Sequence, residues 1–171
     1  MKVILHLCAD IGSDSYPYQC DNNYKVILIG KDYGVENLTK EKLLTDFGVS
    51  EVYGIIANPV CTDLSAARSG GKPKFVYQPW EFGSAWTKKT ALWGEFNIPQ
   101  KVYKDFPKQL QIQEMYVRTS RDTKPSLPFQ HKSVVKRIKE FEPFIDRGKT
   151  DADLRSLCSQ KFAKAFYEAN K

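Results

Sequence analysis

Short apolar runs alternate with polar segments through the first 58 positions of the chain. Two nearly continuous runs, KVILHLC at 2–8 and KVILI at 25–29, predict strands covered on both faces, as in parallel sheets. The segment TKEKLLTDFG at 39–48 predicts a helix that begins at its N-capping threonine and ends at its glycine. A third strand is predicted in VYGIIAN at 52–58. This succession of strand, crossover, strand, helix and strand indicates an α/β fold with a mostly parallel sheet.

The second half of the chain is less regular. KFVYQPW at 74–80 and TKKTALWGEF at 87–96 predict two strands around a Pro-Trp-Glu-Phe-Gly turn. The segment SVVKRIKEFEPF predicts a short helix cut at Pro143, and the last residues predict an amphipathic helix with a break near Ser159. Residues 100–132, with three prolines among polar side chains, are expected to be rich in loops. We therefore expect one domain over 1–171, comprising a core sheet, a loop-rich basic region and a closing helix at 1–99, 100–149 and 150–171.

Composition and charge narrow the class of protein. A chain of 171 residues with 42% hydrophobic residues can bury a sizeable core, which excludes disorder as the default. The net charge of +6 predicts a surface that attracts polyanions, of which nucleic acid is the commonest. Charge alone fits a basic protein without such a partner equally well.

The cysteines and the N-terminus bear on the compartment. The four cysteines are far apart and form no C-x-x-C pair, which favours a reducing, intracellular (cytoplasmic) setting over a zinc module or a disulfide framework. The first apolar run breaks at Asp10, too early for a signal peptide or a membrane span. The two histidines, His6 and His131, do not form the pattern of a metal site, and His6 is expected to pack within a strand.

The loops after the three strands are the candidate sites, because parallel sheets place ligands at the carboxyl ends of their strands. Gly12 in the first loop would let the backbone approach a cofactor, although a plain turn fits as well. Asp32 and Glu36 in the second loop could accept hydrogen bonds from a ribose, or be two solvated acids. Cys61 in the third loop could act as a thiolate nucleophile, or be an inert, half-buried cysteine.

Taken in order, these segments resemble the DNA cytosine-5 methyltransferase family, especially its small phage or mobile-element members. LHLCADIGSDSYPY is similar to the family's cofactor loop, and ANPVCTDLS to its Pro-Pro-Cys catalytic loop. KPKFVYQPWEFGSAWTKKTALWGEFNIP is similar to a later strand pair, and RSLCSQKFAKAFYEANK to the closing helix. The resemblance implies a shortened Rossmann-like, S-adenosylmethionine-dependent methyltransferase fold that acts on DNA.

The resemblance also assigns roles to residues. Cys61 matches the nucleophile that adds to C6 of a flipped cytosine, and Ser65 matches a serine of the catalytic loop. Positions expected at the cofactor are Asp10, Gly12, Ser13, Glu36, Asn37 and Asn58. Positions expected at the DNA backbone are Arg68, Lys88 and Lys89.

One part of the family pattern is missing. The segment ARSGGK passes directly to the KPKF strand, where family members have a further helix and a strand that ends in a catalytic Glu. Glu81 is the only nearby acid that could substitute. The loss predicts an exposed sheet edge, covered by neighbouring strands or by a second copy of the chain.

We therefore expect a DNA cytosine-5 methyltransferase homologue that is weak or inactive. The alternatives are a non-catalytic module that binds nucleic acid or protein, and an enzyme that lost a middle segment.

Overall fold

The computed structural model describes residues 1–9, 11–58, 72–110, 116–118, 123–125, 127, 130–148 and 150–171. The chain divides into two compact units, Met1–Gly70 and Gly71–Lys171, called unit 1 and unit 2 below. Whether they act as the single domain expected from the sequence stays a prediction. Four predicted site residues lie outside the described residues: Asp10, Cys61, Ser65 and Arg68.

Unit 1 is built on a three-stranded parallel sheet in the order β2-β1-β3. Its strands are the three predicted from the apolar runs: β1 at Lys2–Leu7, β2 at Tyr24–Ile29 and β3 at Gly54–Ala57. Its helices are α1 at Tyr16–Gln19, the 3-10 helix η1 at Val35–Asn37, and α2 at Lys40–Phe47. The α/β class and the parallel sheet are thus confirmed.

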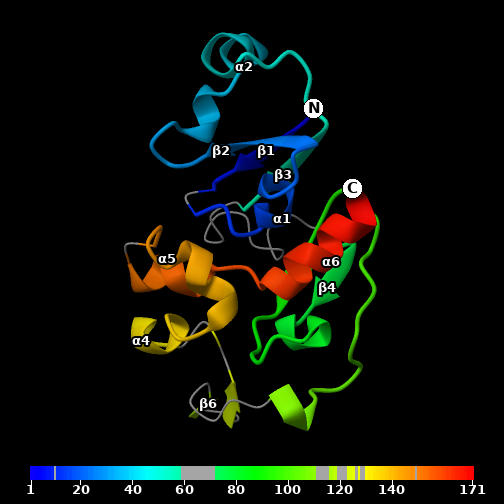
Figure 1. The fold of residues 1–171 in the computed structure, drawn as a ribbon, viewed down its shortest axis with the longest axis vertical. Coiled ribbons are helices and arrows are strands. Elements are labelled where there is room, and N and C mark those ends of the chain that lie inside the picture. The colour runs from blue at the N-terminus through cyan, green and yellow to red at the C-terminus, as the bar shows by residue number, and fades with distance from the viewer. Residues whose placement is uncertain are drawn as a thin grey trace. The chain divides into compact units, whose positions relative to one another are not determined.

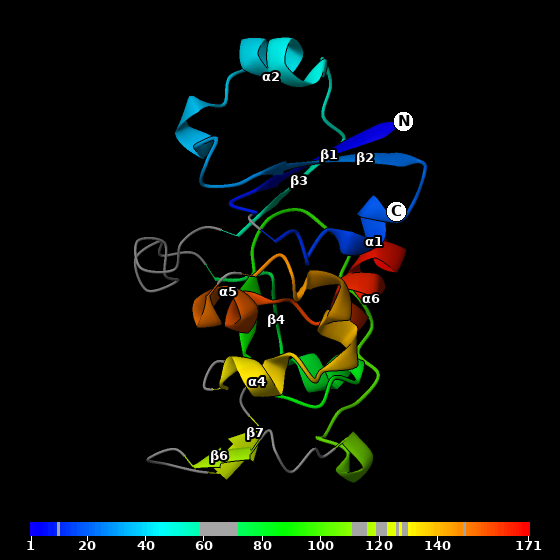
Figure 2. The ribbon, with the colours of Figure 1, turned by 60° about the vertical axis from the view of Figure 1, so that its left-hand side comes forward.

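The two faces of this sheet are covered by different helices. Leu5, Ile27 and Ile29 form the core of one face, against which the apolar side chains of α2 and η1 pack. Figures 1 and 2 show α2 on one side of the sheet and α1 on the other. The predicted limits of α2 are confirmed, because Thr39 Oγ1 accepts a hydrogen bond from Lys42 N and Gly48 ends the helix at φ +65°.

The edge strand β3 is less well covered than its neighbours. Ile55 lies on the α2 face of the sheet but is 63% exposed, and Tyr53 just before the strand is 51% exposed. Among the described residues, β3 pairs only with β1. An exposed edge agrees with the expectation from the sequence, whereas the loss of a segment and a second copy of the chain as the cover stay predictions.

Unit 2 begins with the two predicted strands, β4 at Phe75–Tyr77 and β5 at Thr90–Leu92. They pair antiparallel and are joined through the 3-10 helix η2 at Pro79–Phe82. Its remaining elements are η3 at Lys108–Leu110, β6 at Tyr116–Arg118, β7 at Thr123–Pro125, α4 at Lys132–Val135, η6 at Lys139–Phe144, α5 at Asp151–Ser156 and α6 at Gln160–Asn170. In the parts of the chain that are described, no helix has the length and apolar character needed to cross a membrane.

One prediction for unit 2 is wrong and one is confirmed. Within the region expected to be rich in loops, the short strands β6 and β7 pair antiparallel, which leaves that expectation standing. The helix expected to be cut at Pro143 is interrupted earlier, at the extended Ile138, and η6 passes through the proline. The closing helix does break at Ser159, whose ψ of 122° separates α5 from α6.

The core of unit 2 is aromatic. The rings of Tyr77 and Phe162 stack with centroids 3.8 Å apart, and Phe82 meets both edge to face. Cys158 and Ala163 complete the buried cluster. The apolar face of α6 therefore packs on β4 and η2, as its amphipathic sequence predicts.

Candidate functional site

The strand order of unit 1 defines a topological switch point at the carboxyl edge of the sheet. The chain leaves β1 for β2 on one side and later returns as β3 on the other side, so the connections diverge between β1 and β3. In open parallel sheets, ligands bind just outside such a switch point. Asn58 follows β3 directly and donates a hydrogen bond of 2.8 Å to Asp14 Oδ2 in the loop after β1. The two loops therefore meet at the switch point.

A buried histidine organises this edge of the sheet. His6 is fully buried within β1, with Nδ1 lying 2.8 Å from Ser15 Oγ and Nε2 lying 3.0 Å from Asn58 Nδ2. Ser15 Oγ donates to Gly12 O, so it accepts from the histidine. Asn58 Nδ2 is a donor, so Nε2 accepts. The pattern fits a neutral imidazole protonated on Nδ1, and burial lowers the pKa of His6 although the Asp14 carboxylate acts in the opposite direction.

Gly12 is required by the shape of the loop. Its φ is +75°, and a Cβ at this position would lie 2.9 Å from Leu28 Cδ1 and 3.0 Å from Gln19 Nε2. The Gln19 amide donates to both Gly12 O (2.8 Å) and Ser15 Oγ (3.0 Å), which fixes the loop from the α1 side. Among the described residues, Cys8, at φ +55°, is the non-glycine residue with a left-handed backbone, and it follows β1 directly.

The other predicted cofactor residues of unit 1 fall at two places. Ser13 is buried, and its hydroxyl donates to Asp14 Oδ2 at 3.4 Å, so its side chain supports the loop. Glu36 and Asn37 are exposed on η1 in the loop after β2. The structure therefore brings Gly12 and Ser13 together with Asn58 and puts Glu36 and Asn37 one loop further along.

The two predicted DNA-contact lysines of unit 2 differ from each other. Lys88 Nζ donates to the carbonyl oxygens of Ser156 (2.7 Å) and Leu157 (3.1 Å), so it stabilises the carboxyl end of α5. Lys89 is exposed. Of these two, Lys89 is the side chain better placed to meet a phosphate, and the DNA contact itself stays a prediction.

Sequence reasoning missed Ser15 and Gln19 and underestimated His6. His6 is expected from the sequence to pack within a strand, and its complete burial agrees with that expectation. The sequence did not predict that His6 joins the loop after β1 to the residue after β3 through hydrogen bonds with Ser15 and Asn58. A histidine in the middle of an apolar strand must find partners for both ring nitrogens, and this requirement is the signal that points to polar residues in the adjacent loops.

Comparisons with known proteins do not identify the family. The chain matches no family model, no curated protein and no solved structure. Among the described residues, no group of three or more His, Cys, Asp or Glu side chains is arranged to hold a metal ion. The resemblance to DNA cytosine-5 methyltransferases therefore stays a prediction.

Proposed function

We propose that unit 1 binds S-adenosylmethionine and that the protein is a DNA cytosine-5 methyltransferase homologue with weak or no turnover. The observation that carries the proposal is the strand order β2-β1-β3, which brings the Gly12 loop and Asn58 to one switch point. The hydrogen bonds of His6 hold this edge in one arrangement, as a preorganised ligand site requires.

The residues at this edge fit such a cofactor. Gly12 lets the loop after β1 turn tightly, because the side chains of Leu28 and Gln19 occupy the space that a Cβ would fill. Glu36 is an exposed carboxylate one loop along the same edge, where it could accept hydrogen bonds from ribose hydroxyls. When bound, S-adenosylmethionine supplies an electrophilic methyl group, and the residues of this chain bind and orient it.

The position of Glu81 supports weak turnover. Its Oε2 accepts a hydrogen bond of 2.6 Å from Gln78 N, and its Oε1 forms an ion pair of 2.7 Å with Lys101. Oε2 thus caps the start of η2, and Oε1 pairs with Lys101. An acid that is to hold a cytosine while the Cys61 thiolate adds to C6 needs an oxygen available to the base. Each Glu81 oxygen already has one partner within unit 2, so we expect Glu81 to be a poor substitute for the family's catalytic acid.

The distribution of charge favours a second candidate, a module that binds nucleic acid without catalysis. Unit 1 has 6 basic and 9 acidic side chains, a net charge of −3, whereas unit 2 has 20 basic and 11 acidic side chains, a net charge of +9. The excess positive charge of the chain is thus confined to unit 2. A polyanion would be attracted to that unit alone.

Two measurements test these candidates. S-adenosylmethionine should raise the melting temperature of the protein, because a ligand that binds only the folded state stabilises it. Transfer of labelled methyl groups to DNA should be weak and should disappear in Cys61→Ser, while the control Cys20→Ser, which changes an exposed cysteine, retains it. A cofactor-induced shift without transfer favours the non-catalytic module. Absence of both the shift and the transfer overturns the methyltransferase proposal.

A further inference from the structure

Unit 2 contains a cavity that none of the roles above uses. Its volume is about 520 Å³, within the usual range for small-molecule sites. Its walls are mainly apolar, formed by Ala85, Trp86, Leu110, Val134 and Ile138. Trp86 is almost fully buried, and its indole ring packs on Phe141 with the centroids 5.1 Å apart. The indole therefore borders the cavity but presents almost no accessible surface to it.

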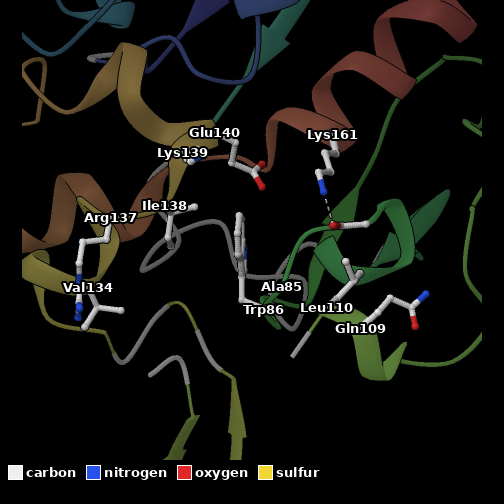
Figure 3. Close-up of a pocket in the computed structure, with 11 residues that line it drawn as sticks. Ala85, Trp86, Gln109, Leu110, Val134, Arg137, Ile138, Lys139, Glu140 and Lys161 are labelled. Atoms are coloured by element: carbon white, nitrogen blue, oxygen red, sulfur yellow. Dashed lines mark hydrogen bonds between the residues drawn. The ribbon is translucent and has the colours of Figure 1, made fainter. Parts of the chain in front are cut away.

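A carboxylate lies inside this cavity next to the indole. Figure 3 shows the Glu140 carboxylate directed toward Trp86. Ser84 Oγ donates to Glu140 Oε1 at 3.0 Å, and Gln160 N donates to Oε2 at 2.7 Å. These hydrogen bonds fix the carboxylate but do not use all of its acceptor capacity. It can still accept a hydrogen bond from an N–H group of a ligand.

The indole nitrogen of Trp86 is an unsatisfied donor. Among the described residues, its Nε1 is the buried side-chain polar atom that has no hydrogen-bond partner. A buried tryptophan N–H usually finds an acceptor. An acceptor group on a bound ligand would satisfy it after a small shift of the ring.

The charge of the cavity residues decides the class of ligand. Among the described residues, Arg137, Lys139 and Lys161 line the cavity together with one acid, Glu140, so these four side chains have a net charge of +2. Arg137 and Lys139 are exposed and lie on the other side of the cavity from Leu110 and Gln109 in Figure 3. A cationic ligand is disfavoured by this excess, whereas an anion is attracted to it.

We propose that this cavity binds a nucleoside phosphate unit, with its base against Trp86 and Glu140 and its phosphate toward Arg137 and Lys139. A planar base would pack on the indole once the ring shifts, its ring acceptors and amino group would pair with the indole N–H and the carboxylate, and its phosphate would pair with the cationic residues. The unit is either a free mononucleotide or one nucleotide of a single strand. The inference uses residues of unit 2 only, so it does not depend on the proposed cofactor site in unit 1.

The test measures binding to the whole protein by calorimetry, with the four 5′-mononucleotides, a short single-stranded oligonucleotide and inorganic phosphate as probes. Binding of a mononucleotide identifies the free ligand, and binding of the oligonucleotide alone identifies the strand. Either should also move the indole N–H resonance of Trp86, assigned by its loss in Trp86→Phe. Equal binding of inorganic phosphate, or binding without a change at Trp86, overturns the proposal.

Matched variants locate the site. Lys139→Ala removes a charge from the cavity and should weaken binding by about tenfold, as expected for a charged hydrogen bond. Lys136→Ala removes an exposed lysine of the same segment that does not line the cavity, and should leave the affinity within about twofold. Equal losses in the two variants, or no binding of any probe at millimolar concentration, would refute the assignment.

Discussion

At the scale of single residues, the carboxyl edge of the unit 1 sheet depends on the protonation state of His6. Asn58 Nδ2 donates to both His6 Nε2 and Asp14 Oδ2. A proton on Nε2 would therefore face another donor. Rotation of the Asn58 amide would bring its oxygen toward the Asp14 carboxylate, so the amide cannot adapt without cost. The neutral imidazole is thus a condition for the observed arrangement.

The first prediction concerns the pH dependence of stability. Burial lowers the pKa of folded His6 below the value of 6.5 for an unperturbed histidine, so the unfolded state binds the proton more strongly. The contribution of His6 to the free energy of unfolding should therefore be constant above about pH 6.5 and should decrease as the pH falls below that value. Urea unfolding from about pH 8 to about pH 5 measures the change. His6→Gln should flatten this part of the curve, and parallel curves for the two proteins would contradict the assignment.

The second prediction concerns the backbone of Cys8. A left-handed conformation costs an ordinary residue about 1–2 kcal/mol, and glycine avoids this cost but loses about 0.5–1 kcal/mol in chain entropy. Cys8→Gly should therefore raise the free energy of unfolding by about 0.5–1 kcal/mol. Cys20→Gly is the control, since Cys20 is exposed and has a right-handed backbone, and it should be destabilising or neutral. Destabilisation of both variants would contradict a strained Cys8.

At the scale of elements, the segments that short-range patterns determine could be predicted from the sequence. The three strands of unit 1 follow from apolar runs, and α2 follows from its capping residues Thr39 and Gly48. The break before α6 follows from Ser159, whose hydroxyl accepts a hydrogen bond from Phe162 N. These features depend on neighbours within a few positions, so one sequence contains the necessary information.

Long-range polar contacts could not be predicted in the same way. Asn58 and His6 are 52 positions apart, and Glu140 meets Ser84 across 56 positions. No periodicity relates such pairs, and each depends on how the elements pack. The sequence pointed to the loops of the candidate site, whereas the hydrogen bonds that hold those loops emerged only from the structure.

The third prediction concerns Glu140, which connects η6 with α6 and the segment after η2 through Gln160 and Ser84. Burial is the main influence on its pKa and raises it above 4.5, although hydrogen bonds from Gln160 and Ser84 oppose the rise. The folded state then holds the proton more strongly than the unfolded state does. Relative to Glu140→Gln, wild-type stability should be highest below about pH 4.5 and fall as the pH rises through the folded pKa.

Thermal or urea unfolding of the two proteins across this pH range gives the difference curve. Glu142→Gln changes an exposed carboxyl of the same segment, and its curve should run parallel to that of the wild type. A Glu140→Gln curve that also stays parallel would show that the carboxyl is not destabilised by burial.

At the scale of the whole molecule, the dominant feature is the separation of charge between unit 1 at −3 and unit 2 at +9. The fourth prediction compares two double variants that change the net charge equally. Lys89→Glu with Lys104→Glu alters exposed residues of unit 2, and Lys31→Glu with Lys40→Glu alters exposed residues of unit 1. The unit 2 variant should bind a DNA fragment about tenfold more weakly or worse, because those lysines lie in the unit that attracts phosphate.

The unit 1 variant should lose only on the order of twofold in affinity, because its charges act at a distance and are screened. Fluorescence anisotropy at several salt concentrations measures both effects, and the unit 2 variant should also show a shallower salt dependence. Equal losses in the two variants would mean that net charge alone governs DNA binding.

The same separation of charge bears on how copies of the protein behave toward each other in solution. A uniformly basic protein repels its copies, and added salt relieves that repulsion. Here the acidic unit of one copy attracts the basic unit of another, so light scattering at low ionic strength should show a weaker repulsion than a uniformly basic protein with the same net charge of +6 gives. The uneven distribution of charge should therefore reduce the effect of added salt on the interaction between copies.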